Sequence, residues 1–349
     1  MPCRDERKGK RQALQEMMEG NRQDREPWSE LRPITVGLVN NMPDSAFLDT
    51  ENQFRGATLG ANGSGIEFEL YTIKEIPRSE KVAALIEERY RGLDELWARP
   101  PDALIVTGTE PTQVKLRFEP YWPYLARLLE WAGDHVRTTL LSCLASHASI
   151  LLFDGIERTP RTTKCSGVFE GTVEDPLDAL AAGLPETVCI PHSRVNDVPE
   201  TALVDAGYRI VIGTGSSGAG WSVAAREHRD GLFVLCQGHP EYGTLSLLRE
   251  YRRDVRRSLF GRGAVPYPRL PDGYLGEEAV ETMMKFERRA HATDMDPREL
   301  WPTFPFDEVA ATVENNWAPV SAALYANWLQ LARAAVPAGA HDALLRRAA

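Results

Sequence analysis

Cys143 is the residue of this 349-residue chain whose setting best suits a chemical nucleophile. It follows the buried-strand run TTLLS and precedes the helical pattern LASHASILL. A turn from a parallel strand into a helix raises a side chain above the carboxyl edge of the sheet. Helix N–H groups at that point favour a thiolate and can hold a developing oxyanion. The pattern therefore predicts a cysteine nucleophile at this turn.

A thiol nucleophile needs a base, and the base needs an acceptor that orients it. His239 and Glu241 supply both in the sequence GHPE, directly after the strand-like run LFVLCQ. The fixed φ of the intervening Pro240 can turn the carboxylate back toward the imidazole. A helix cap at Glu241 and a structural histidine are the simpler alternative. We favour a catalytic triad of Cys143, His239 and Glu241.

The remaining cysteines, Cys3, Cys165, Cys189 and Cys236, are widely spaced and form no C-x-x-C pair. An odd number of scattered cysteines is typical of reduced thiols in a cytosol and gives no zinc signature. Cys236 ends a strand-like run, where a core residue is expected. We therefore predict no disulfide framework and no metal.

Buried strands alternate with helices through the first half of the chain. The strand patterns are PITVGLV, IEFELYTI, DALIVTG and TTLLS, and helical spacing follows the second, third and fourth of them. This alternation predicts a three-layer α/β sandwich with a mostly parallel central sheet. Shorter runs follow between about 160 and 240, and Arg-Asp-Gly between WSVAAREH and LFVLCQG favours a hairpin.

We expect three regions along the chain. Residues 1–33 mix both signs of charge and predict a flexible arm, and residues 34–260 form the α/β catalytic domain. Residues 261–349 begin with a Pro/Gly-rich link and continue as a helical extension packed on the same domain. The segment 213–218 fits G-x-G-x-x-G, but a strand rather than a helix is expected after it, so we interpret it as a loop.

Composition excludes several classes of protein. A net charge of −10 and a pI of about 5.4 argue against a general nucleic-acid binder. No apolar run approaches the roughly 18 residues that span a bilayer. The charged start MPCRDERKGKRQ is not a secretory signal. We therefore expect a cytoplasmic protein that associates with neither nucleic acid nor membrane.

Two polar clusters are predicted on loops. Lys164 lies in RTTKCSG, and Ser193 lies in PHSR between His192 and Arg194. Taken alone, charged loop residues of this kind are more often solvated than functional. Arg253 lies in a helix among several arginines, most of which should form a solvated face.

An ordered set of motifs resembles the homoserine O-acyltransferase family that uses a cysteine, commonly called homoserine O-succinyltransferase. The set runs over roughly residues 34–330: NNMPDSAFLDTENQF, DALIVTG, PYWP, LEWAGDHV, the Cys143 turn, TTKCSGVFE, PHSR, GHPEY, RRDV and ANWL. The resemblance implies a class I glutamine amidotransferase-like (flavodoxin-like) fold and a role in methionine biosynthesis.

The resemblance also implies a mechanism and its participants. Acyl-CoA acylates Cys143, and the homoserine hydroxyl then attacks with His239 as base, in a ping-pong cycle. Lys164 and Ser193 should contact substrate, and Arg253 should bind the amino acid's carboxylate. Succinyl-CoA or acetyl-CoA is then a co-substrate, no cofactor or metal is implied, and a homodimer is the family's usual form.

Departures from the family pattern lie around the pocket. Leu144 follows the nucleophile where similar proteins have tryptophan, although its backbone N–H still suits an oxyanion hole. TEPTQ replaces APLG, so Thr112 occupies the acyl-selecting position that is glycine in succinyl users and glutamate in acetyl users. Glu110 would repel a succinyl group, whereas Lys115 or Arg117 would attract one. We favour succinyl over acetyl.

Three alternatives stay open at this point. In the first alternative, the acceptor of the acyl group is L-serine or another hydroxy amino acid. In the second, the chain is a glutamine amidotransferase or glutaminase. In the third, it is a non-catalytic sensor of CoA or an amino acid. Ser142 and Leu144 flank the cysteine where amidotransferases usually have glycines, so ammonia transfer is the weaker reading.

Overall fold

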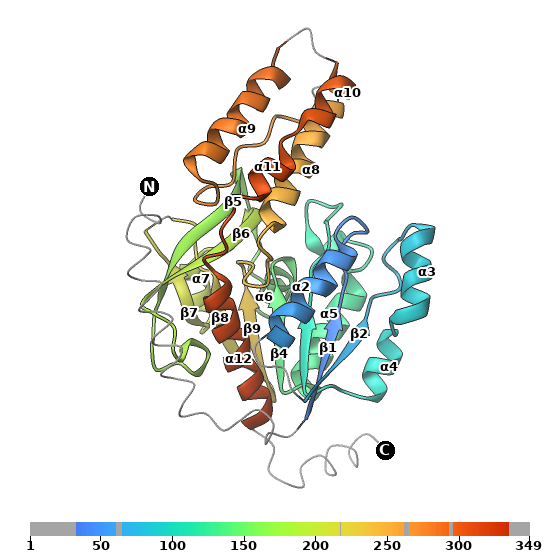
Figure 1. Cartoon of the computed structure of the whole chain (residues 1–349). Helices are drawn as coiled ribbons and strands as arrows, with labels where there is room; N and C mark the ends of the chain where they lie inside the picture. Colours follow the sequence, from blue (N-terminus) through green and yellow to red (C-terminus); the bar gives the residue numbers. More distant parts are fainter. Residues whose placement is uncertain (1–32, 61–64, 217, 262–264, 293–295, 335–349) are drawn as a thin grey trace.

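The computed structural model describes residues 33–60, 65–216, 218–261, 265–292 and 296–334 (Figure 1). The predicted flexible arm, residues 1–33, lies outside the described residues except for Pro33. The division into a catalytic domain and a C-terminal extension stays a prediction.

A nine-stranded sheet with the order β2-β1-β3-β4-β9-β8-β7-β5-β6 forms the centre of the described molecule. Its first five strands pair in parallel, as their nearly continuous apolar runs predict. All four residues of β3 and all five of β4 are buried, because helices cover both faces. These strands are β1 (Ile34–Val39), β2 (Ile66–Tyr71), β3 (Ala103–Val106), β4 (Thr138–Ser142) and β9 (Gly231–Cys236).

The other half of the sheet is antiparallel. It consists of β8 (Val223–His228), β7 (Arg209–Thr214), β5 (Thr159–Val173) and β6 (Thr187–Asp197). The β8–β9 hairpin is confirmed, and Arg229 takes a φ of 53° in its turn. The prediction that the Lys164 and Ser193 clusters lie on loops is wrong, because both lie in the long strands β5 and β6.

Helices cover both faces of the sheet, which confirms the three-layer sandwich. One apolar core unites the sheet with α2 (Phe47–Gly60), α3 (Glu80–Arg89) and α12 (Ala318–Ala334). The core on the opposite face contains α4 (Leu93–Ala98), α5 (Trp122–His135), α6 (Leu144–Asp154) and α7 (Glu200–Asp205). Trp328 of α12 donates to Thr138 Oγ1 at 2.9 Å, which fixes that helix against the start of β4.

A group of helices stands beyond one end of the sheet in Figure 1. It comprises α8 (Ser246–Phe260), α9 (Glu277–Ala290), α10 (Pro297–Leu300) and α11 (Phe306–Ala310), which share a third apolar core around Tyr251, Met283 and Phe304. Among the described residues no helix is long and apolar enough to cross a membrane. In the segment 213–218, β7 ends at Thr214 and the next described element is β8, so no helix opens there to receive a pyrophosphate.

Candidate active site

Cys143 lies at the turn between β4 and α6, as predicted. Its φ of 50° and ψ of −104° are rare for a residue with a side chain, and such conformations concentrate at functional sites. The Cys143 N–H donates to the carbonyl of Cys236 at 2.7 Å, so the turn is tied to the end of the neighbouring strand β9. The side chain is neither buried nor fully exposed. The sulfur is therefore held at the carboxyl edge of the parallel strands.

His239 and Glu241 follow β9 and reach the same edge. His239 Nδ1 lies 2.8 Å from Glu241 Oε1, and the Cys143 side chain hydrogen-bonds the imidazole. Because Nδ1 faces the carboxylate, Nε2 is the nitrogen left for the sulfur. The hydroxyl of Ser142 also donates to Glu241 Oε1, at 3.2 Å. The structure thus brings the three predicted residues together in the order thiol, imidazole and carboxylate.

The charge state of His239 is set by its neighbours. Burial alone would lower the pKa of the imidazole, but the Glu241 carboxylate and the Cys143 sulfur together raise it well above its ordinary value. Tyr242 stacks on the imidazole with ring centroids 4.3 Å apart. The backbone N–H of His239 donates to the carbonyl of Pro191 on β6 at 2.7 Å. These contacts fix the ring and keep it ready to carry a proton.

Gln237 stabilises the turn that carries Cys143. Its Oε1 contacts His147 Nε2 at 2.9 Å, and its Nε2 donates to the carbonyl of Trp221 at 2.9 Å. Burial lowers the pKa of His147 to about 4, so this ring is neutral near pH 7. The contact joins the first turns of α6 to the end of β9, and so it holds the nucleophile and the base on one frame.

A second polar cluster gathers around Glu250 of α8. Its Oε2 accepts from Ser193 Oγ and from Lys164 Nζ, the latter at 3.3 Å, and its Oε1 accepts from Tyr242 at 2.5 Å. Lys164 also contacts Asp254 Oδ2 at 2.8 Å. The antiparallel pairing of β5 with β6, in which Ser166 faces Ser193, brings Lys164 and Ser193 to this point. Tyr242 links this cluster to the triad because the same side chain stacks on His239.

Glu250 is the residue of this cluster that sequence reasoning missed. Burial alone would raise its pKa, but Lys164 and Arg253 lower it, so it stays a carboxylate. Arg253 and Asp254 follow Glu250 by three and four residues, and this spacing places all three on one face of a helix. That spacing was the available signal, but the surrounding arginines made the helix resemble a solvated face. Arg253 Nε donates to Asp254 Oδ1 at 3.1 Å.

Thr112 lies on the segment between β3 and α5. Its hydroxyl donates to Glu119 Oε2 at 3.0 Å, and the side chain is otherwise exposed. Glu110 forms an ion pair with Arg257 of α8 at 3.3 Å, and Arg117 donates to the carbonyl of Leu151 on α6 at 3.3 Å. The segment is therefore fastened to α8 and to α6, the helix that begins directly after the nucleophile.

Leu144 is the first residue of α6, where a backbone N–H has no partner within the helix. Gly108 lies directly against it: a Cβ added at Gly108 would come within 2.5 Å of Leu144 Cβ and 3.3 Å of its nitrogen. The glycine thus gives the chain room to approach the predicted oxyanion position.

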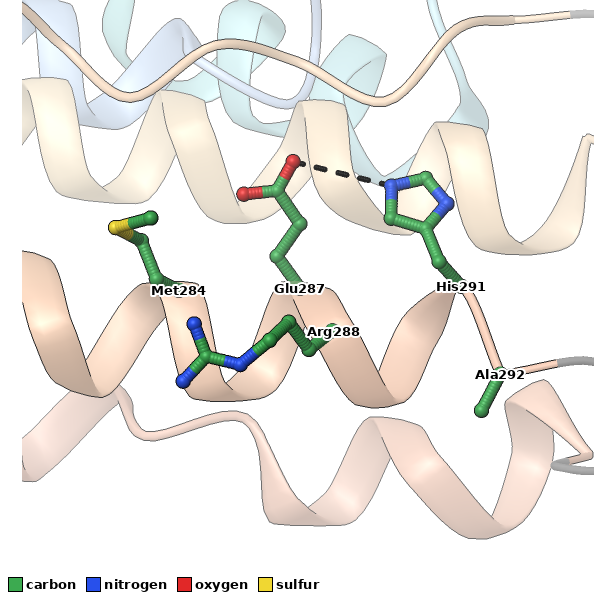
Figure 2. Close-up of a pocket in the computed structure, with 5 residues that line it drawn as sticks. All are labelled: Met284, Glu287, Arg288, His291 and Ala292. Carbon is green, nitrogen blue, oxygen red and sulfur yellow. Dashed lines mark ion pairs between the residues drawn. The ribbon is translucent and has the colours of Figure 1, made fainter.

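A surface depression of about 500 Å³ lies elsewhere, on α9 of the helical group. Figure 2 shows its lining side chains and the contact of Glu287 with His291 at 3.8 Å. None of these residues belongs to the elements that carry the triad, so the depression is not the site of the chemistry. Within the described ranges no cluster of three or more His, Cys, Asp or Glu side chains is arranged to hold a metal ion.

Comparison with known proteins places the chain in a family. A family profile described as Homoserine O-succinyltransferase matches residues 8–337. The chain is 41% identical over 300 residues to homoserine O-succinyltransferase of Methylorubrum extorquens, with 86% of this chain and 87% of the relative covered. It is 39% identical over 307 residues to the Bradyrhizobium japonicum protein of the same name, with 85% and 92% covered.

Solved structures of low identity also match. A glutamine amidotransferase from Thermotoga maritima is 12% identical, with a TM-score of 0.41 and coverage of 86% of this chain and 98% of that one. A glutamine amido transferase from Methylobacillus Flagellatus is likewise 12% identical, with a TM-score of 0.42 and coverage of 86% and 96%. The sequence relatives confirm the resemblance drawn from the motifs and the expectation of an acyltransferase enzyme. The chain belongs to the homoserine O-succinyltransferase family.

Proposed function

We propose that this protein transfers an acyl group, preferably succinyl, from acyl-CoA to the hydroxyl of L-homoserine through a thioester on Cys143. The observation that carries the proposal is the Cys143–His239–Glu241 triad, joined through Tyr242 to the Lys164–Ser193–Glu250 cluster. One half of the site suits covalent acyl transfer, and the other half suits a small zwitterion.

In the first half-reaction His239 takes the proton of the Cys143 thiol, and the sulfur attacks the thioester carbonyl of the donor. Negative charge develops on the carbonyl oxygen, and we assign the backbone N–H of Leu144, the first residue of α6, to receive it. The tetrahedral intermediate collapses with loss of the CoA thiolate. An acyl-cysteine remains, and the CoA thiolate takes up a proton, with the imidazolium of His239 as the nearest donor.

In the second half-reaction the acceptor hydroxyl attacks the acyl-cysteine. His239 takes the hydroxyl proton while Glu241 holds the ring in position and stabilises the resulting imidazolium. The second tetrahedral intermediate expels the Cys143 sulfur, and the ester product leaves. The imidazolium of His239 then returns its proton to the expelled thiolate, which restores the free thiol of Cys143.

The Glu250 cluster supplies the charges that an amino acid requires. Arg253 offers a planar fork for the acceptor's carboxylate, whereas the Glu250 carboxylate attracts its ammonium group. Lys164 and Ser193 contact Glu250 and fix its orientation. Tyr242 contacts both Glu250 and His239. A zwitterion bound at Glu250 therefore extends its side-chain hydroxyl toward His239.

Intact-mass measurement tests the proposal. The protein is mixed with succinyl-CoA or acetyl-CoA without acceptor, and we expect a stoichiometric mass increase on Cys143 that is larger with succinyl-CoA. Subsequent addition of homoserine should remove the added mass and yield the O-acyl product, whereas serine should act more slowly. Cys143→Ala should gain no mass. Acyl transfer by Cys143→Ala at the parent rate would refute the covalent route.

A further inference from the structure

An arginine that the cycle above does not use lies within electrostatic reach of the nucleophile. Arg158 follows the end of α6 and precedes β5, and its charge interacts with those of Cys143, Tyr121 and Glu119. Its Nε is buried and has no hydrogen-bond partner within the described residues. Tyr121 is only 6% exposed, and its hydroxyl is likewise buried without a hydrogen-bond partner within the described residues. Two buried donors whose side chains interact electrostatically thus lack an acceptor within the described residues.

The nearby carboxylate is held away from these donors. Glu119 Oε2 accepts from Thr112 at 3.0 Å, and its Oε1 accepts from the Gln113 N–H at 2.6 Å. Both carboxylate oxygens of Glu119 thus accept hydrogen bonds from residues of the same loop. Glu119 interacts with the Arg158 charge electrostatically but forms no ion pair with it. The guanidinium is therefore available to an anion that enters from outside.

The protonation states of both donors fit an anionic ligand. Burial lowers the pKa of Arg158 from its ordinary value, but a guanidinium remains charged at neutral pH. Burial and the Glu119 carboxylate raise the pKa of Tyr121, so its hydroxyl keeps the proton that it would donate. Buried donors without partners are rare in native proteins, and each calls for an explanation such as a catalytic role, a water or an ion.

We propose that Arg158 and Tyr121 form the subsite that binds the distal carboxylate of a succinyl group while it is transferred to and from Cys143. A succinyl group carries this carboxylate two methylene groups beyond its thioester carbon. Arg158 interacts electrostatically with both Cys143 and Tyr121, so the proposal assigns the carboxylate of a succinyl group on the Cys143 sulfur to these two donors. The inference rests on the proposed function and adds the residues that recognise the acyl group.

A donor comparison tests the subsite. Acylation of Cys143 is followed by intact mass with succinyl-CoA and with butyryl-CoA, which has the same chain length without the charge. For the parent protein we expect succinyl-CoA to give the higher kcat/KM. Arg158→Gln should lower the succinyl-CoA value by about 100-fold and leave the butyryl-CoA value nearly unchanged, because only the charged donor loses its partner. Tyr121→Phe should lower the succinyl-CoA value by about 10-fold.

The controls separate this inference from the proposed function. Arg99→Gln removes an exposed guanidinium that pairs with Glu67 of β2, so the ratio of the two donors should not change. A loss of folded protein lowers the acylation rate equally with both donors, so it does not change the ratio of their kcat/KM values. An equal fall for both donors in Arg158→Gln would assign the arginine to a CoA phosphate or to folding and overturn the subsite. Absence of acylation by every donor in the parent protein would instead refute the proposed function.

Discussion

Gly108→Ala is expected to disable the oxyanion position without touching the triad. The added methyl group would lie 2.5 Å from Leu144 Cβ and 3.2 Å from Leu144 Cα. Carbon atoms in contact are normally about 3.5–4.0 Å apart, so one of the two backbones has to move by about 1 Å.

The Gly108 side of this contact cannot yield easily. Thr107 N–H donates to the carbonyl of Val39 at 3.1 Å, and Thr107 Oγ1 accepts from the N–H of Asn41 at 2.8 Å. Asn41 Nδ2 also donates to the Thr107 carbonyl, at 3.2 Å. Because this segment is fixed to the neighbouring strand, we expect Leu144 and the first turn of α6 to move instead.

The size of the effect follows from that movement. A displacement of about 1 Å in catalytic geometry costs about 100-fold in rate, and loss of one oxyanion donor costs about 100- to 1000-fold. We therefore expect acylation of Cys143 by saturating succinyl-CoA to slow by about 100-fold. Overpacking should also lower the free energy of unfolding by about 1–3 kcal/mol.

Single-turnover acylation followed by intact mass measures the first quantity, and urea unfolding measures the second. Gly56→Ala is the matched control, because an added Cβ on that helical glycine meets nothing within 4 Å. The control should acylate at the parent rate. Acylation of Gly108→Ala within about twofold of the parent would show that the Leu144 position does not stabilise the transition state.

Two other substitutions probe the base and the acceptor site. Glu241→Gln removes the charge that raises the pKa of His239, so the rising acid limb of the pH–rate profile should move to lower pH, and the plateau should fall by about 100- to 10,000-fold; an acid limb that stays in place would contradict the assigned role. Glu250→Gln should raise KM for homoserine by about 10-fold or more and leave acylation without acceptor unchanged, while the surface variant Glu287→Gln should alter neither value. Equal loss in both half-reactions for Glu250→Gln would indicate a structural role.

The parallel half of the fold and the triad could be predicted because their signals are local. A short apolar run followed by a helical pattern is enough to place Cys143 at a turn, and the GHPE sequence after another apolar run is enough to place His239 near it. The carboxyl ends of parallel strands share one edge, so the two segments meet although they are far apart in sequence.

The antiparallel half could not be predicted in the same way. Strand β5 contains Pro160, Lys164 and several exposed polar residues, so it lacks the apolar run of a buried strand. Its extended conformation comes from pairing with β6, which is a tertiary contact. Glu250 and Arg158 were missed for a related reason: which charged side chains face inward depends on the packing of α8 and of the segment after α6.

Contact between Cys143 and His239 also has a consequence for timing. The free sulfur is one of the groups that hold a proton on the imidazole. A thioester sulfur carries no charge and no hydrogen, so this contribution ends as soon as the acyl group is attached. The imidazole then releases its proton more readily, at the moment when an incoming alcohol has to lose one. In the proposed cycle, this change in the proton affinity of His239 favours acylation first and transfer to the acceptor second.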